Sequence, residues 1–187
     1  LWCSSLRRMA AVTRDVGEEV EAAGWEACAE RCSASMVRLM WRETDGWMSD
    51  CLRPQGKVWV QSEEFRPNQL FAVSLPGAPI TGERARRLVS AVERELLTPV
   101  GLRTLASGSG AYEARFEGTL FERDRAYHNG TVWPWLIGPF GEAMLRADGF
   151  SVAAKARVRG IIAPMVAEFV GRGDWGSRSL LSVPEVY

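Results

Sequence analysis

Apolar residues recur every three or four positions along most of this sequence, and this spacing limits the folds that the chain can adopt, because it matches the period of an amphipathic helix. The pattern covers the first forty residues, with breaks expected at Gly17 and Gly24, and returns at residues 66–75, 81–97, 133–147 and 151–170. No alternation of strand and helix patterns accompanies it, so a parallel sheet is not expected. The sequence therefore predicts an all-α fold of about six helices built as helical hairpins.

Two stretches interrupt the helical pattern. Residues 47–60 carry Pro54 and Gly56 among scattered apolar residues, which predicts a long excursion or a short β-ribbon. Residues 101–130 lack clear periodicity and are rich in Gly and Ser. A loop of this length inside a compact domain is usually functional, so we expect candidate site residues close to it.

Composition argues against two classes of partner. The chain has 23 basic and 23 acidic side chains and hence a formal net charge of zero. Nucleic acids and anionic membranes both select a basic surface, and no apolar run approaches the roughly 20 residues that span a bilayer. We therefore expect no nucleic-acid partner and no membrane partner.

The four cysteines favour free thiols over a metal site. Cys28 and Cys32 lie four residues apart in a helical stretch, but a zinc site needs two further ligands nearby, and the only histidine, His128, is distant. Reduced, partly buried thiols are typical of a cytosolic protein. No glycine-rich phosphate loop and no Gly-x-Ser-x-Gly motif occurs either. The sequence thus predicts a cytoplasmic protein without metal or cofactor.

Residues 121–135 hold the densest group of chemically useful side chains. This segment contains two acids, two arginines, a tyrosine, the histidine and two of the eight tryptophans. Such a mixture can hydrogen-bond hydroxyl groups and stack on a sugar ring. The alternative is a loop that its aromatic residues pin to the core, with its charges in water.

Two further segments carry candidate polar groups. Residues 66–69 read Arg-Pro-Asn-Gln, so that Asn68 and Gln69 could exchange hydrogen bonds with sugar hydroxyls and Arg66 could pair with a catalytic carboxylate. The alternative is a helix N-terminus whose polar residues only cap and solvate it. Glu185 stands among apolar residues near the chain end, where it is either a buried catalytic carboxylate or a charge on a frayed terminus.

Four segments form motifs in a fixed order. Residues 65–76 read FRPNQLFAVSLP, residues 95–105 read ELLTPVGLRTL, and residues 127–135 read YHNGTVWPW. Residues 1–10 read LWCSSLRRMA. These segments resemble the RPNQ–hydrophobic–AVSLP, LLTPxGLRTL, YHxGTVWPW and LWYNALRLMA segments of bacterial glycogen debranching enzymes, with Cys3-Ser4-Ser5 in place of the usual YNA. The resemblance covers nearly the whole chain.

This resemblance implies a partial (α/α)6 toroid, the fold of six-hairpin glycosidases. Residues 1–187 would be a single fragment, about the C-terminal half of such a glucosidase domain, truncated at both ends. It also implies that the parent enzyme hydrolyses α-1,6-linked glucose at glycogen branch points by an inverting mechanism with two carboxyl groups. Glu185 matches the general base. The residues that would shape the glucose subsite are Arg66, Asn68, Gln69, Tyr127, His128, Trp133 and Trp135.

The general acid of the family lies in a W-M-D-type segment that has no match here. Residues 47–50, Trp-Met-Ser-Asp, resemble it only superficially and stand in the wrong place. We therefore expect little activity from the chain alone. Its expected partners are glycogen or a branched α-glucan and the missing upstream half of the toroid. The alternatives are a non-catalytic glycan-binding or interaction module, or an inactive truncated gene product.

Overall fold

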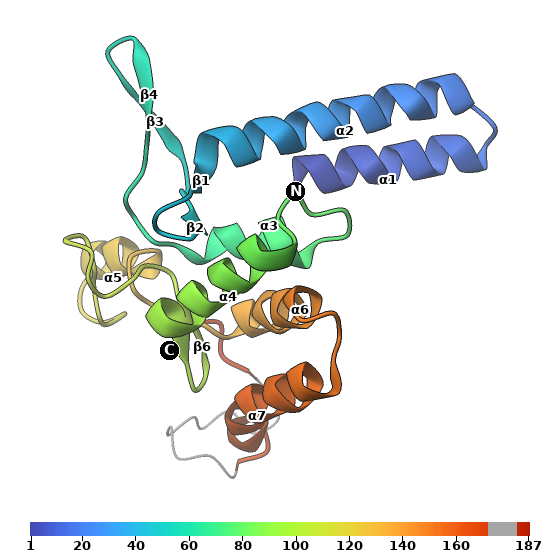
Figure 1. The fold of residues 1–187 in the computed structure, drawn as a ribbon. Coiled ribbons are helices and arrows are strands. Elements are labelled where there is room, and N and C mark those ends of the chain that lie inside the picture. The colour runs from blue at the N-terminus through green and yellow to red at the C-terminus, as the bar shows by residue number, and fades with distance from the viewer. Residues whose placement is uncertain (172–182) are drawn as a thin grey trace.

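The computed structural model describes residues 1–171 and 183–187 of the chain (Figure 1). In this part the α-helices are α1 (Trp2–Asp15), α2 (Glu19–Met40), α3 (Phe71–Ser74), α4 (Gly82–Leu96), α5 (Leu120–Tyr127), α6 (Ile137–Ala147) and α7 (Val152–Phe169). Two 3-10 turns, η1 (Pro67–Leu70) and η2 (Pro134–Leu136), lead into α3 and α6. The strands are β1 (Trp41–Arg42), β2 (Trp47–Met48), β3 (Leu52–Gln55), β4 (Val58–Gln61), β5 (Leu97–Thr98), β6 (Gly101–Arg103) and β7 (Val132–Trp133).

The expectation of an all-α fold, a partial (α/α)6 toroid of helical hairpins, is wrong. Helices make up 56% and strands 11% of the structure, and the strands form small antiparallel sheets, so the architecture is mixed α and β. The pairs β1–β2 and β3–β4 are two-stranded, and β5–β6–β7 is three-stranded. These strands are two to four residues long. Segments this short cannot display the alternation by which strands are recognised in a sequence.

Most helical segments otherwise follow the apolar spacing, but α5 lies within residues 101–130, where a loop and no helix was expected. Gly17, with φ +88°, separates α1 from α2, whereas α2 continues through Gly24, where a break was expected. The ribbon expected within residues 47–60 is confirmed by β3 and β4, which pair from Leu52 with Gln61 to Gln55 with Val58. The last helix, expected over residues 151–170, is α7.

The hydrophobic core lies between α4, α6 and the η1–α3 segment. Phe140 of α6, Leu88 of α4 and Leu70 of η1 are completely buried there. Helix α7 packs against the outer side of α6 through Val158, Ile161 and Ile162, which are partly buried. This body of helices supports the candidate site described below, because η1 contacts α4 and α6 and the strand β5 contacts α4.

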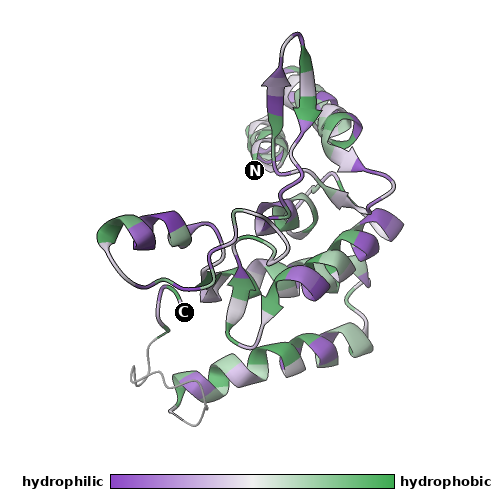
Figure 2. Ribbon diagram, turned by 90° about the vertical axis from the view of Figure 1, so that its left-hand side faces the viewer, coloured by the Kyte–Doolittle hydropathy of each residue, from purple (hydrophilic) through white to green (hydrophobic). Residues whose placement is uncertain are grey.

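Two parts of the chain extend from this body. Helices α1 and α2 lie side by side and project away as a hairpin (Figure 1). The β3–β4 ribbon also projects, and Figure 2 shows a mostly hydrophilic β3 beside a more hydrophobic β4. On β4, Trp59 is 67% exposed. Among the described residues, no helix combines the length and apolar character needed to cross a membrane.

Candidate functional site

A cavity of about 400 Å³ opens between segments that are far apart in the sequence. Its wall is formed by residues at the start of η1, in the loop before β7, at the end of β7 and in η2. Single residues just after β2 and β6 complete it. The lining residues are Asp50, Arg66, Pro67, Asn68, Thr104, His128, Asn129, Trp133, Trp135 and Leu136. The structure thus gathers five of the predicted site residues, Arg66, Asn68, His128, Trp133 and Trp135, around one space.

Arg66 joins the two main walls of the cavity. Its guanidinium donates to the Glu64 carboxylate over 3.0 Å, to the Thr104 carbonyl oxygen over 3.4 Å and to Asn129 Oδ1 over 2.8 Å, and it also donates to the His128 carbonyl oxygen. These bonds use four of the five N–H donors of an arginine side chain. Arg66 therefore positions the loop that carries His128 and Asn129, and its charge pairs with Glu64 rather than with Glu185.

The ion pair affects Glu64 as well. Burial alone would raise the pKa of this carboxyl, but the hydrogen bond and charge of Arg66, together with those of Arg53, outweigh it and lower the pKa below its usual range. Glu64 therefore stays ionised at neutral pH and holds the Arg66 side chain, which is 16% exposed, in one orientation.

Two glycines allow the polypeptide to fold tightly behind the aromatic loop. Gly130 has φ +150°, and a Cβ at this position would overlap the carbonyl oxygen of Glu113. Gly101 also has φ +150°, and its Cβ would lie 2.6 Å from the carbonyl oxygen of Trp133. Thr104 ties the same region together, because its hydroxyl donates to the Thr131 carbonyl and accepts from the Gly130 amide. Gly101, Gly130 and Thr104 thus allow the backbone segments of the motifs to pack closely against one another.

The aromatic side chains of the loop form a packed cluster. The Tyr127 ring lies 4.8 Å from the Trp133 ring and 4.7 Å from the His128 ring, and the His128 and Trp133 rings stack at 5.4 Å. The Trp133 indole N–H donates to the Tyr127 carbonyl oxygen over 3.0 Å. Trp135 instead stacks on Phe71 at 6.2 Å and stays 54% exposed. The aromatic residues therefore hold part of the loop in place, as the alternative interpretation expected, while His128, Trp133 and Trp135 also line the cavity.

Glu185 reaches this region through Tyr127. The Tyr127 hydroxyl donates to Glu185 Oε1 over 2.6 Å. The chain end is fixed beside β7, since the backbones of Tyr187 and Val132 exchange two hydrogen bonds. The pKa of Tyr127 is raised, chiefly by its hydrogen bond to Glu185 and to a smaller extent by burial and by the charge of Glu185. Tyr127 therefore keeps its proton and donates this bond at neutral pH. Within the described part of the chain, neither Tyr127 nor Glu185 is in the lining of the cavity, and Glu185 is exposed, so its carboxylate is not buried.

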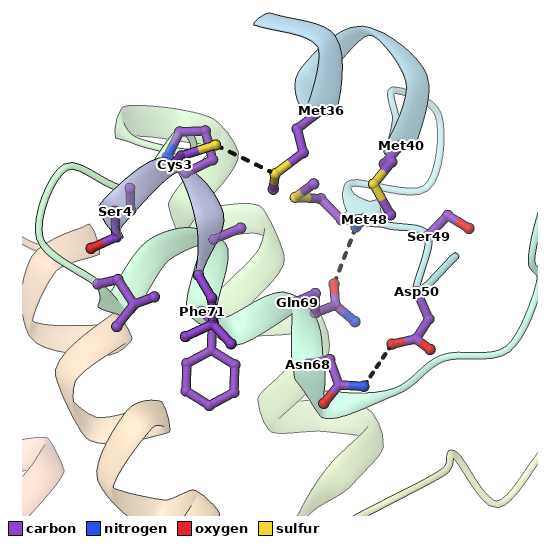
Figure 3. Close-up of a pocket in the computed structure, with 15 residues that line it drawn as sticks. Cys3, Ser4, Met36, Met40, Met48, Ser49, Asp50, Asn68, Gln69 and Phe71 are labelled. Carbon is purple, nitrogen blue, oxygen red and sulfur yellow. Dashed lines mark hydrogen bonds between the residues drawn. The ribbon is translucent and has the colours of Figure 1, made fainter. Parts of the chain in front are cut away.

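Gln69 points away from this cavity into a neighbouring one of about 110 Å³, shown in Figure 3. It is 5% exposed, its Oε1 accepts from the Met48 amide over 3.1 Å, and its Nε2 donates to the Arg66 carbonyl over 2.9 Å. Both ends of the side-chain amide are thus used on the backbone. Gln69 fixes the end of β2 against η1.

Comparison with known families decides the identity of this arrangement. A family model described as amylo-alpha-1,6-glucosidase matches residues 1–185. The chain belongs to this family. No curated protein matches the sequence. The resemblance predicted from the four motifs is thereby confirmed, and the chain is a glycoside hydrolase-related domain of the glycogen-debranching type.

Five members of the cavity wall in this amylo-alpha-1,6-glucosidase-family chain were not predicted as site residues, and three of them have polar side chains: Asp50, Thr104 and Asn129. Thr104 and Asn129 lie inside or beside the recognised motifs, so their position there was the available signal. Asp50 ends the segment of residues 47–50 that resembles the general-acid segment only superficially, and that resemblance did not point to this cavity. Among residues 1–171 and 183–187, no group of three or more His, Cys, Asp or Glu side chains is arranged to hold a metal ion.

Proposed function

We propose that this chain forms the glucose-binding wall of an enzyme that hydrolyses α-1,6-linked glucose in glycogen or another branched α-glucan. The cavity lined by two tryptophans and by hydrogen-bonding side chains carries this proposal. An indole face packs against the C–H face of a pyranose, while amides and imidazole exchange hydrogen bonds with its hydroxyls. The volume of about 400 Å³ lies within the range of small-molecule sites. Membership of the amylo-alpha-1,6-glucosidase family supports the choice of bond.

In this scheme six of the seven residues predicted to shape the glucose subsite divide into two groups, and the seventh, Tyr127, contacts Glu185. Asn68, His128, Trp133 and Trp135 would contact the sugar, because they line the cavity. Arg66 and Gln69 would position them, because their polar groups already bind the backbone and other side chains. Trp135 offers the most exposed aromatic surface, and its stacking on Phe71 restrains the orientation of its ring.

Glu185 would act as the general base of an inverting hydrolysis. Such a reaction uses two carboxyl groups about 6.5–9.5 Å apart, one of which protonates the leaving oxygen as the glycosidic bond breaks. The other takes a proton from the water that forms the new bond to the anomeric carbon. The hydrogen bond from Tyr127 to Glu185 Oε1 supports this role, since it leaves the second carboxylate oxygen able to orient the water.

The test is glucose release from a branched limit dextrin, by the chain alone and joined to its genomic upstream neighbour. We expect Glu185→Gln to lower the rate about 10²–10⁴-fold, the usual contribution of acid–base assistance, with dextrin binding retained. Glu142→Gln is the matched control, because Glu142 only pairs with Arg146 on the surface of α6.

Equal rates for these two variants would remove Glu185 from the mechanism. Dextrin binding without glucose release by the chain in either form would instead indicate a non-catalytic glycan-binding module.

A further inference from the structure

Asp50 stands where two cavities meet. It lines both the cavity of about 400 Å³ beside Trp133 and Trp135 and the smaller cavity drawn in Figure 3. Among the described residues that form the larger cavity wall, it is the only carboxylate. Its side chain is half-buried, so its position toward the cavity is a property of the fold and not of a free surface chain.

The backbone next to Asp50 is held from several directions. The buried Ser49 hydroxyl oxygen lies 2.9 Å from the carbonyl oxygens of both Cys51 and Ser62 and donates its one proton to either of them. The Ser49 amide donates to the Met40 carbonyl over 2.8 Å, and the Met48 amide donates to Gln69 Oε1. Because these bonds restrain the backbone on both sides of Asp50, binding a ligand costs this segment little further conformational entropy. Asp50 is in this sense preorganised for a ligand contact.

The hydrogen bonding of Asp50 leaves acceptor capacity toward the cavity. Asn68 donates from Nδ2 to Asp50 Oδ1 over 2.9 Å, and Figure 3 shows this bond as the link between the two side chains. In the described part of the chain no arginine, lysine or histidine pairs with Asp50. An ionised carboxylate accepts about four hydrogen bonds, so most of this capacity is free.

We infer that Asp50 is a specificity-determining residue that, with Asn68, binds a pair of adjacent hydroxyl groups of the glucosyl unit in the cavity. One hydroxyl donates to the Asp50 carboxylate, and its neighbour accepts from the second N–H of Asn68. Hydrogen bonds to a charged acceptor are roughly twice as strong as neutral ones, and adjacent equatorial hydroxyls match such an acceptor–donor pair. This inference rests on the proposed function and adds to it the feature that distinguishes glucose from its epimers.

The test measures binding of methyl α-D-glucopyranoside and of its monodeoxy analogues by titration calorimetry, followed by Asp50→Asn and Asp50→Glu. For the unaltered protein, we expect one or two of the analogues to bind about 10–100-fold more weakly, the effect of losing a hydrogen bond to a charged group. In Asp50→Asn the parent glucoside should bind more weakly by a similar factor, and removal of the hydroxyl that contacts Asp50 should then cost no further affinity. Asp45→Asn is the matched control, because Asp45 pairs with Arg42 in the β1–β2 turn outside this cavity.

Each outcome decides between the two proposals. If no glucoside binds the unaltered protein, the proposed function and the role of Asp50 both fall. If the glucoside binds but every deoxy analogue binds within about threefold of it, the proposed function stands and the Asp50 assignment is overturned. The Asp50 assignment is also overturned if Asp50→Asn keeps the hydroxyl dependence of the unaltered protein. The analogue series needs no variant, so it decides the question even if Asp50→Asn does not fold.

Discussion

Helices α2 and α6 show how differently two regions of this chain use the same helical period. Helix α2 has 22 residues and fully buries two of them, both alanines. Helix α6 has 11 residues and buries six, including Phe140 and Met144. The hairpin of α1 and α2 is thus held chiefly by contacts between its own helices, whereas α6 packs against α3, α4 and α7. Helical spacing in a sequence therefore indicates a helix but does not indicate how much that helix contributes to the core.

The largest expected effect tests this contrast directly. Phe140→Ala removes a completely buried ring from the body and should lower the free energy of unfolding by about 3–5 kcal/mol, because it deletes apolar contacts and leaves a cavity. Val16→Ala alters a residue that is 71% exposed at the end of the hairpin, and it should change the free energy of unfolding by no more than about 0.5 kcal/mol. Urea unfolding followed by circular dichroism measures both values. Comparable losses in the two variants would contradict the division into a packed body and a lightly buried hairpin.

A pair of glycine substitutions sharpens the comparison through the backbone. Gly24→Ala lies inside α2, where nothing stands within 4 Å of the added Cβ, and should stabilise the protein by about 0.4–1 kcal/mol. Gly130→Ala places a Cβ against the carbonyl oxygen of Glu113 at a φ of +150° and should destabilise it by about 1–3 kcal/mol. In thermal unfolding, the midpoint temperature should therefore rise in Gly24→Ala and fall in Gly130→Ala. Tryptophan fluorescence should also change in Gly130→Ala alone, because Trp133 packs in the loop that this glycine permits.

The sequence predicted the helices well because their signal is local. Apolar residues three and four positions apart define α4, α6 and α7 without reference to the rest of the fold. The approach of residues 66–68 to residues 128–135 was also predicted, though through the family motifs rather than through any local rule. The site roles of these residues remain predictions.

The features that the sequence did not reveal depend on long-range contacts. The strands β5, β6 and β7 pair residues 97–103 with residues 132–133, and two- or three-residue strands leave no pattern. Gln69 was predicted to contact sugar, yet the fold turns its amide onto the Met48 and Arg66 backbones. The place of Asp50 in the cavity likewise follows from the path of residues 41–65, which no periodicity specifies.

The smallest expected effect concerns a contact within the hairpin. The thiols of Cys3 and Cys32 share a hydrogen bond over 2.8 Å, across the interface of α1 and α2. Burial, the hydrogen bond that the neutral Cys32 thiol shares with Cys3, and the charge of Cys3 raise the pKa of Cys32 to about 11. Since only the thiolate reacts, about one per cent of Cys32 would be reactive at pH 9. Alkylation of Cys32 by iodoacetamide, followed by peptide mass spectrometry, should therefore accelerate tenfold per pH unit until about pH 11.

The variant Cys3→Ala separates the causes of the raised pKa of Cys32. Cys3→Ala removes the hydrogen bond and the charge but leaves most of the burial, which is the largest cause, so the midpoint of Cys32 alkylation should move down only part of the way toward an ordinary cysteine value. Helical content by circular dichroism should stay unchanged, which separates this effect from opening of the hairpin. A midpoint already ordinary in the unaltered protein would mean that α1 and α2 separate often enough to expose Cys32. Such opening would make the hairpin still more independent of the body than its burial indicates.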